Sequence, residues 1–167
     1  MNIIVLGAGS FGTAVGNELS VNKLNQVCLF SRNNSKVNEI NKYHTNVACF
    51  PNKQLNDNLK ATSDPKDLIN ANVIFIAIPS KEVINVLRNF KPYFNDETLF
   101  VNLSKGLVSE ATTIIESLDY ELGIQNAVSL KGPSFAVEVM DHAHTLMTLG
   151  YKNSSQYDII YKIIKNT

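Results

Sequence analysis

A glycine-rich turn directly after the first apolar segment is the feature that most constrains the fold of this chain. Residues 3–6 read Ile-Ile-Val-Leu, a continuous apolar run that predicts a strand buried on both faces. Residues 7–12 then read Gly-Ala-Gly-Ser-Phe-Gly, and a helical pattern begins at Ser10. In this setting the three glycines allow a tight turn, close approach of a pyrophosphate, and close packing of helix on strand. The sequence therefore predicts a strand, turn and helix that bind a dinucleotide at the helix N-terminus.

The rest of the chain alternates short apolar runs with helical patterns. We expect further strands at residues 27–30, 59–62, 73–78, 99–103, 127–130 and 145–149. We expect helices from Ser10, at 36–42, from Asp64-Pro65, after Pro79-Ser80, across 111–118, at 135–140 and at 154–165, and a long polar connection over 43–58. This alternation is typical of a parallel sheet covered by helices on both faces. The sequence predicts an α/β, Rossmann-type doubly wound fold with a mostly parallel sheet, in one domain over residues 1–167.

The composition excludes several classes of function. Lys and Arg total 15 and so do Asp and Glu, so the chain has no net charge that would attract nucleic acid or acidic membranes. No apolar run approaches the roughly 20 residues that span a bilayer, and no basic region precedes the short apolar start. Cys28 and Cys49 fit neither a metal-ligand spacing nor a disulfide framework. We therefore expect a cytoplasmic protein with no nucleic-acid partner and no membrane span.

Two histidines are the nearest approach to a metal site in the sequence. His142 and His144 lie two residues apart beside Asp141, but no third ligand comes at a useful spacing. We interpret them as a surface pair and expect no metal. We interpret Cys28, in a buried strand, as a small core residue rather than a nucleophile.

The residue just after the second predicted strand bears on the choice of cofactor. An acidic residue about 20 positions after the glycine turn would bind the ribose 2′-hydroxyl of NAD. That position here holds Arg32, between Ser31 and Asn33, and an arginine suits the 2′-phosphate of NADP. A solvated arginine at the start of a loop is the alternative. We expect NADP or NAD as the cofactor, with NADP favoured.

Three more segments follow predicted strands, at the edge where open parallel sheets bind ligands. They are Pro79-Ser80, Ser104-Lys105-Gly106 and Gly132-Pro133-Ser134. A lysine beside a glycine can place its ammonium group against an anionic or carbonyl oxygen. The spacing alone leaves two alternatives open, namely that Lys105 serves surface solubility and that Ser134 caps the next helix.

Taken together, four segments resemble bacterial NAD(P)-dependent glycerol-3-phosphate dehydrogenase. They are residues 5–14, 77–80, 104–107 and 132–138, in the order that the family has them. The Lys-Gly-Leu and Gly-Pro-Ser-Phe-Ala sequences within them discriminate better than the glycine motif does. With the turn glycines and Pro79, the resemblance implies a cofactor site of Gly7, Gly9, Ser10, Phe11, Gly12, Arg32, Pro79, Lys105 and Ala136. It also implies that Lys105, Gly132 and Ser134 bind a small phosphate substrate.

The resemblance carries an activity with it. The family reduces dihydroxyacetone phosphate to sn-glycerol 3-phosphate by hydride transfer from the nicotinamide, for glycerophospholipid synthesis. Family members continue into a helical second domain that supplies a catalytic lysine and most phosphate contacts. We therefore expect no catalytic residue within this chain and a base beyond Thr167. The resemblance is also compatible with a homodimeric whole protein.

Two departures from the family concern substrate contact. Lys131 stands where the family usually has a small residue, and residues 46–52 match the family's loop only loosely. Two other functions stay open, a non-catalytic module that senses NADPH and a related dehydrogenase acting on a hydroxy acid or a nucleotide sugar. A sensor would not need Lys105, Gly132 and Ser134. The related dehydrogenases would lack the two discriminating segments.

Overall fold

Seven strands form a single sheet in the computed structural model, which describes residues 1–108, 112–165 and 167. The order of the strands across the sheet is β3-β2-β1-β4-β5-β6-β7. All neighbouring strands are parallel except β6 and β7, which are antiparallel. The strands are β1 (Asn2–Leu6), β2 (Gln26–Phe30), β3 (Lys60–Thr62), β4 (Val73–Ile76), β5 (Leu99–Asn102), β6 (Ala127–Lys131) and β7 (Thr148–Gly150).

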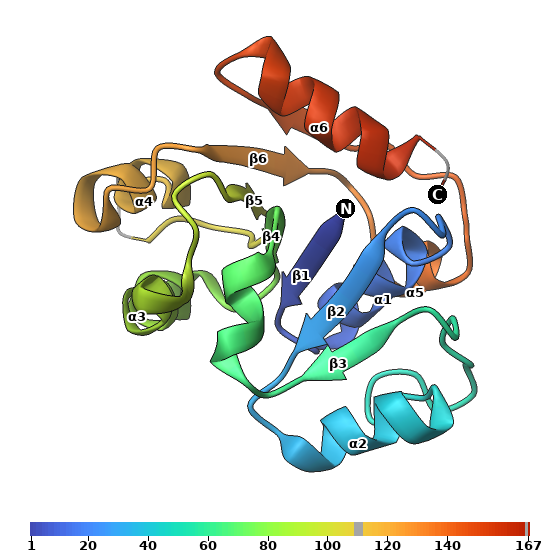
Figure 1. Ribbon diagram of the computed structural model, residues 1–167. Coiled ribbons are helices and arrows are strands. Elements are labelled where there is room, and N and C mark those ends of the chain that lie inside the picture. The colour runs from blue at the N-terminus through green and yellow to red at the C-terminus, as the bar shows by residue number, and fades with distance from the viewer. Residues whose placement is uncertain (109–111, 166) are drawn as a thin grey trace.

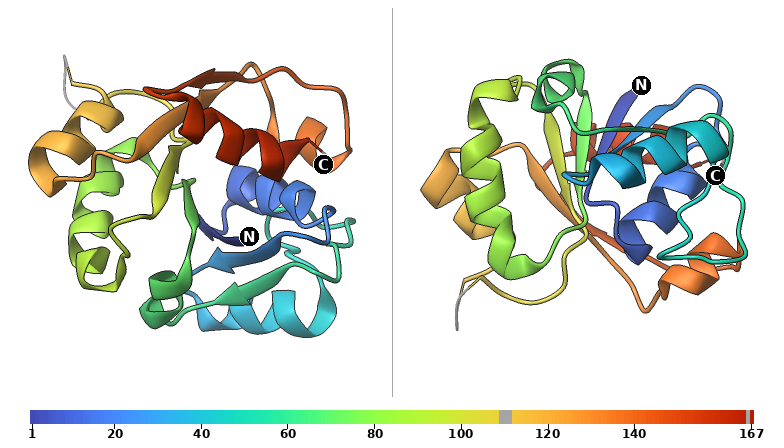
Figure 2. Two further views of the ribbon diagram at one scale, coloured as in Figure 1. Left: turned by 45° about the horizontal axis from the view of Figure 1, so that its top comes forward. Right: turned by 90° about the horizontal axis from the view of Figure 1, so that it is seen from below.

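Helices cover both faces of this sheet (Figure 1). They are α1 (Ser10–Leu19), α2 (Asn34–Tyr43), α3 (Ser80–Phe90), α4 (Ile114–Leu122), α5 (Ala136–Met140) and α6 (Ser154–Ile164), with 3-10 helices η1 (Pro65–Asn70) and η2 (Lys91–Tyr93). The right-hand view of Figure 2 shows α3 and α4 on one side of the sheet and α1, α2 and α5 on the other. This arrangement confirms the predicted Rossmann-type α/β fold. None of the described helices is long and apolar enough to cross a membrane.

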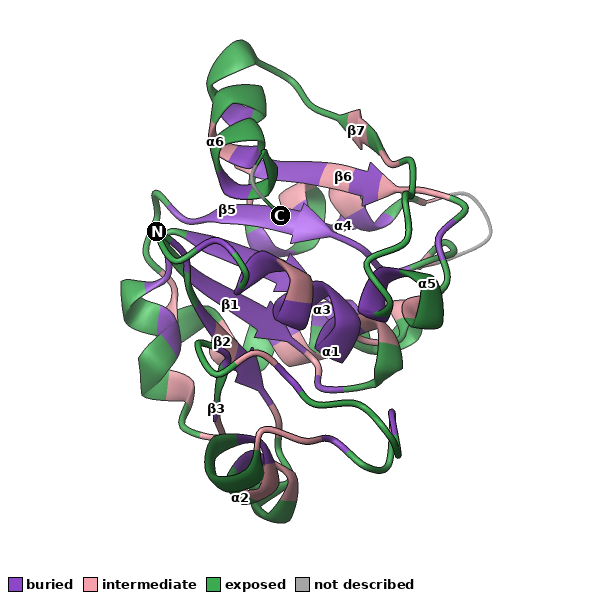
Figure 3. Ribbon diagram, turned by 90° about the vertical axis from the view of Figure 1, so that its right-hand side faces the viewer, coloured by how far each residue is buried: buried purple, intermediate pink, exposed green. Residues whose placement is uncertain are grey.

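The continuous apolar runs are explained by two cores, one on each face of the sheet. In β1, Ile3 and Val5 pack into the core under α1, whereas Ile4 and Leu6 pack into the core under α3. The four residues of β4 alternate between the two cores in the same way. Successive strand side chains point to opposite faces, so a strand covered on both faces needs an apolar residue at every position. Figure 3 shows these central strands as buried.

Several predicted elements end earlier than expected. The strand predicted over 73–78 ends at Ile76, and the one predicted over 99–103 ends at Asn102. In both places the backbone leaves the sheet and continues as a loop at its edge. Of the last strand, predicted over 145–149, only Thr148 and Leu149 pair with β6, and the strand continues to Gly150. The helix predicted from Asp64-Pro65 is the 3-10 helix η1, with Asp64 accepting a hydrogen bond of 2.9 Å from the N–H of Lys66. The start predicted at Ala111 lies outside the described residues.

The connection over residues 43–58, predicted to be polar, contributes apolar side chains to the core. It buries Phe50 and Leu55 in the core under α1, so the prediction of a polar connection was wrong at those positions. Asn46 is fully buried, and its side-chain amide donates to Thr13 Oγ1 at 2.8 Å and to the carbonyl of Ala8 at 3.3 Å. This loop therefore rests on α1 and on the glycine turn, and it helps to fix their position.

Candidate functional site

The carboxyl ends of the six parallel strands lie at one edge of the sheet, and those of β1, β2, β4, β5 and β6 border the candidate site. The segments that follow these strands there begin at Gly7, Ser31, Ala77, Leu103 and Gly132. Two cavities open along this edge, one of about 670 Å³ and one of about 600 Å³. We call them the first and the second cavity. Their linings contain most of the site residues that the sequence predicts.

The turn after β1 is tight because of Gly7. Its φ of +117° belongs to a region that residues with a side chain rarely adopt. A Cβ atom there would lie 2.6 Å from the carbonyl oxygen of Ala77, at the end of β4. The N–H of Gly7 donates to the carbonyl of Phe30 at 3.1 Å. The turn is thus held between β2 and β4, and it forms part of the floor of the first cavity.

The start of α1 is open. Gly9 occupies the N-cap position, and no heavy atom of the described residues lies within 4 Å of where its Cβ would be. In the described chain no side chain caps α1, and the first turn of this helix contains no acidic residue. The free N–H groups and the helix dipole favour an anion at this position. Both the space and the donors fit a pyrophosphate. Ser10 is exposed there, and Phe11 extends to the second cavity.

Arg32 lines the first cavity together with a lysine that the sequence analysis missed. Lys36 comes from the first turn of α2, and its ammonium group donates to the carbonyl of Ala8 at 2.9 Å. Asn33 caps α2 by accepting from the N–H of Lys36 at 3.2 Å. Lys36 begins the predicted helix that follows Arg32, and a second cation so soon after Arg32 in the sequence was the available signal. Glu82 of α3 adds one carboxylate to the same cavity, and Pro79 forms part of its wall.

Lys105 and Gly132 line the second cavity together with Phe11. The Lys105 side chain is exposed, and Gly106 beside it has a φ of +95°. Gly132 packs so closely that a Cβ on it would lie 2.2 Å from the carbonyl oxygen of Leu146. The glycine therefore lets the segment before β7 pass directly over the end of β6.

Lys131 also lines the second cavity, and its side chain makes a specific contact there. Its ammonium group donates a hydrogen bond to the carbonyl oxygen of Ser104. Ser104 in turn donates from its hydroxyl group to the carbonyl of Ile78 at 2.5 Å. Burial, and then the nearby charge of Lys105, lower the pKa of Lys131 from 10.5 to about 8. The two lysines thus come from neighbouring strand ends and influence each other.

Ser134 and Ala136 lie outside the linings of the two cavities, as the described residues form them. Ser134 is only 3% exposed, and its hydroxyl group hydrogen-bonds to Thr145 Oγ1. It does not cap α5 either, because the N-cap position is that of Phe135, whose N–H donates to the Glu138 carboxylate at 2.9 Å. Ala136 begins α5 and packs against the core under α1.

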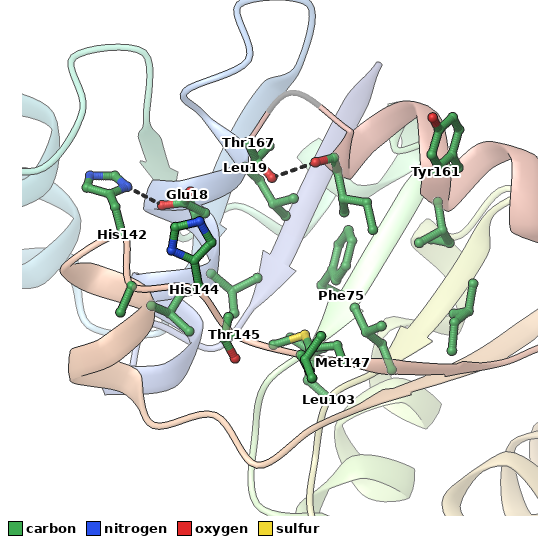
Figure 4. Close-up of a pocket in the computed structure, with 18 of the residues that line it drawn as sticks. Glu18, Leu19, Phe75, Leu103, His142, His144, Thr145, Met147, Tyr161 and Thr167 are labelled. Carbon is green, nitrogen blue, oxygen red and sulfur yellow. Dashed lines mark hydrogen bonds and ion pairs between the residues drawn. The ribbon is translucent and has the colours of Figure 1, made fainter.

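A third cavity of about 740 Å³ lies between α1 and α6 (Figure 4). It shares Leu103, Leu130 and Met147 with the second cavity. At its rim His142 Nδ1 lies 2.6 Å from a carboxylate oxygen of Glu18. Among the described residues, no three His, Cys, Asp or Glu side chains are grouped as a metal ion would require.

The thiol of Cys28 is unsuited to act as a nucleophile. Burial, with a smaller effect from the charge of Asp67, raises its pKa from 9.0 to about 12. The thiol therefore stays protonated at neutral pH, and only a thiolate is strongly nucleophilic.

Comparisons with known proteins agree with this geometry. Residues 2–157 match the family model described as NAD-dependent glycerol-3-phosphate dehydrogenase N-terminus. The glycerol-3-phosphate dehydrogenase (NAD(P)+) of Neorickettsia sennetsu is 34% identical over 161 residues, which cover 96% of this chain and 48% of that protein. The enzyme of the same name from Bacillus subtilis is 35% identical over 90% of this chain and 45% of its own length.

A solved structure agrees as well. The crystal structure of glycerol-3-phosphate dehydrogenase from Coxiella burnetii superposes with a TM-score of 0.85 at 28% identity, covering 98% of this chain and 50% of that one. The chain thus spans about half the length of the relatives it matches. Since the family model covers nearly the whole chain, this chain belongs to the family of NAD-dependent glycerol-3-phosphate dehydrogenase N-terminal domains.

Proposed function

We propose that this chain is the NAD(P)-binding part of an enzyme that reduces dihydroxyacetone phosphate to sn-glycerol 3-phosphate. One observation carries the proposal. The open glycine turn at α1 lies beside a second cavity that contains Lys105, and Phe11 of α1 belongs to the lining of that second cavity. A dinucleotide site and a site for an anionic substrate are therefore adjacent. The names of the relatives support the same activity.

The cofactor would bind in the first cavity, against the glycine turn and the start of α1. The N–H groups at the start of α1 would bind the pyrophosphate, next to Gly7, Gly9 and Gly12. When bound, NAD(P)H supplies the hydride. Pro79 would add a wall of the cavity. Contacts from Ser10 and Ala136 rest on the family resemblance.

We propose that NADP is preferred over NAD. Arg32 and Lys36 give the first cavity two cationic side chains, against the single carboxylate of Glu82. An arginine makes bidentate, charge-assisted hydrogen bonds to a phosphate, and these are stronger than bonds between neutral groups. The 2′-phosphate of NADP provides such a partner, whereas the 2′-hydroxyl of NAD does not.

Lys105 is the residue of this chain that we propose acts on the substrate during the reaction. Its ammonium group would stabilise negative charge on the carbonyl oxygen of the substrate as that oxygen is reduced. Gly132 would line the substrate's position, and a role for Ser134 rests on the resemblance alone. No histidine or carboxylate of the described residues lines the second cavity. On the family resemblance, we propose that residues 1–167 form one NAD(P)-binding domain and that the acid–base group, a lysine in the family, lies outside it.

The proposed activity also bears on the compartment, the metabolic role and the oligomeric state of the whole protein. We place the protein in the cytoplasm, where the thiols of Cys28 and Cys49 would stay reduced, and its product in glycerophospholipid synthesis. We propose a homodimer for the whole protein on the family resemblance.

Calorimetric titration tests the proposed function. We expect the chain to bind NADPH, and the NADPH-loaded chain to bind sn-glycerol 3-phosphate in preference to lactate or a nucleotide sugar. Failure to bind NADPH would contradict the proposed function, and a full-length protein that binds NADPH but not glycerol phosphate would favour a sensor of NADPH. A preference for the hydroxy acid or the nucleotide sugar would favour a related dehydrogenase instead.

A further inference from the structure

The carbonyl oxygen of Ala8, in the middle of the glycine turn, accepts hydrogen bonds from two distant segments. Lys36 of α2 donates from its ammonium group at 2.9 Å, and the side-chain amide of Asn46 donates at 3.3 Å. The thiol of Cys49 lies 3.8 Å from the same oxygen. One backbone oxygen of the turn is therefore held both by α2 and by the connection over residues 43–58.

Both donors are fixed in their own surroundings. Asn33 accepts from the backbone N–H of Lys36 at 3.2 Å, which anchors the start of α2. Asn46 is fully buried, and its amide nitrogen also donates to Thr13 Oγ1 at 2.8 Å. Its Oδ1 atom is buried and has no hydrogen-bond partner among the described residues, which raises the free energy of the fold. The reverse orientation of the amide would direct this oxygen at the carbonyl of Ala8, so the turn explains the orientation that is present.

The held carbonyl determines where the next N–H group points. A peptide group is planar, and in the trans form its C=O and N–H point in opposite directions. The peptide between Ala8 and Gly9 is trans, so the N–H of Gly9 is directed away from the two donors. This N–H has no acceptor among the described residues, and Gly9 lines the first cavity. It is therefore available to a ligand.

Without the two donors, this peptide group would be free to turn over. Gly9 accepts backbone conformations of either sign of φ, so its own structure does not prevent the rotation. A carbonyl oxygen facing the open start of α1 would repel a pyrophosphate, because it carries partial negative charge where the N–H groups carry partial positive charge. The orientation of one peptide group thus decides whether this position attracts or repels an anion.

We propose that Lys36 and Asn46 are positioning residues of the dinucleotide site. By holding the carbonyl of Ala8, they keep the N–H of Gly9 directed at the pyrophosphate, and they do so for NAD and NADP alike. This role differs from that of Arg32, whose partner would be the 2′-phosphate of NADP. The inference deepens the proposed function and rests on it for the binding of a dinucleotide at α1. The orientation of the turn rests only on the contacts with Ala8.

Nuclear magnetic resonance of the ligand-free chain tests the positioning role directly. The ¹³C shift of a backbone carbonyl depends on the hydrogen bonds that it accepts, so the Ala8 signal reports on the bond from Lys36. In Lys36→Met we expect this signal and the amide ¹⁵N signal of Gly9 to move. Both should stay in place in Lys42→Met, the matched control on the exposed surface of α2. Unchanged signals in a folded Lys36→Met would overturn the proposal, as would equal displacements in the control.

Calorimetric titration with NADH separates positioning from recognition of the 2′-phosphate, which NADH lacks. We expect Lys36→Met to weaken NADH binding roughly three- to tenfold, because the turn is then only partly in its binding conformation. NADPH binding should weaken at least as much, and Lys42→Met should bind both cofactors as the parent does. A loss confined to NADPH would assign Lys36 to the 2′-phosphate and overturn the proposal.

A neutral exchange excludes an effect of charge alone. Asn46→Leu keeps the approximate volume of the side chain and removes its donor to Ala8, and it should also weaken NADH binding. Asn17→Leu is the matched control, since Asn17 is buried as well and holds the same connection by accepting from the N–H of Asn56 at 2.7 Å. Equal losses in the two variants would attribute the effect to a loosened connection and overturn the proposal. Lys36 is only half-buried, so its variants carry the test even where Asn46→Leu does not fold.

The same titrations distinguish failure of this inference from failure of the proposed function. A parent chain that binds neither NADH nor NADPH would contradict the proposed function, and the Ala8 and Gly9 signals would still decide how the turn is held. A parent that binds NADH no more tightly than Lys36→Met does would contradict this inference alone.

Discussion

Gly12 lies directly against the carbonyl oxygen of Gly7, so closely that a Cβ atom on Gly12 would come within 1.9 Å of that oxygen. The partner atom belongs to the backbone of a turn that is itself held between β2 and β4, so it cannot move aside easily. Gly12 therefore determines how closely α1 packs on the turn.

We predict that Gly12→Ala destabilises the fold. The added methyl group overpacks the turn, which should lower the free energy of unfolding by about 1–3 kcal/mol. Urea unfolding monitored by circular dichroism measures the change. Gly150→Ala is the matched control, since a Cβ there would lie at an ordinary 3.8 Å from the nearest atom, the carbonyl oxygen of Ser129. Equal stabilities of the parent and Gly12→Ala would show that the turn can relax.

Gly9→Val should do the opposite, leaving the fold intact and removing cofactor binding. The backbone of Gly9, with φ −79° and ψ −177°, is in a conformation that any residue adopts, and its Cβ would meet open space. That space is where the pyrophosphate would lie. Calorimetry with NADPH should therefore show no binding by a variant whose unfolding curve resembles that of Gly150→Val. Near-normal binding by the folded variant would place the phosphates elsewhere.

The strands of this fold were predictable from sequence because burial on both faces needs continuous apolar runs, as Ile3 and Ile4 illustrate by packing into opposite cores. The ends of the strands were not. Ile78 extends the apolar run of β4 by two residues, yet it lines the first cavity instead of pairing in the sheet. An apolar side chain serves either purpose, so a local pattern does not distinguish them.

The site was predictable where a motif fixes the backbone and not where it depends on contacts between distant segments. Gly7 and Gly9 have the positions that their motif implies. The bond from Lys131 to Ser104 joins residues 27 apart in the chain, and no spacing rule identifies it. The same holds for the contact of Ser134 with Thr145, which depends on how the segment before β7 folds back.

Arg32→Ala should reduce the preference for NADPH over NADH. Loss of a charge-assisted bond to the 2′-phosphate should weaken NADPH binding roughly 10- to 100-fold and leave NADH binding nearly unchanged. Fluorescence titration with both cofactors gives the ratio of the two dissociation constants. Arg88→Ala, which removes the other arginine, on α3 and outside the first cavity, is the control. An unchanged ratio in Arg32→Ala would exclude Arg32 as the residue that selects NADPH.

Lys131 should make the stability of the ligand-free chain depend on pH. Its pKa is lowered from 10.5 to about 8 in the folded chain, so between these values the unfolded chain binds more protons than the folded one. The contribution of Lys131 to the free energy of unfolding should therefore rise with pH across this window. The difference in unfolding free energy between the parent and Lys131→Met, measured from pH 7 to 10.5, isolates it. A difference that stays constant or falls with pH would contradict the lowered pKa.

We infer that the carboxyl edge of the sheet binds a dinucleotide across the start of α1. Backbone amide spectra of the ¹⁵N-labelled chain, recorded during titration with NADPH, test it most directly. Saturable shifts should be largest at residues 7–12 and 31–36, with little change around Tyr157 and Tyr161 in the third cavity. Shifts concentrated in the third cavity, or no saturable shifts at all, would show that the dinucleotide does not bind at the start of α1.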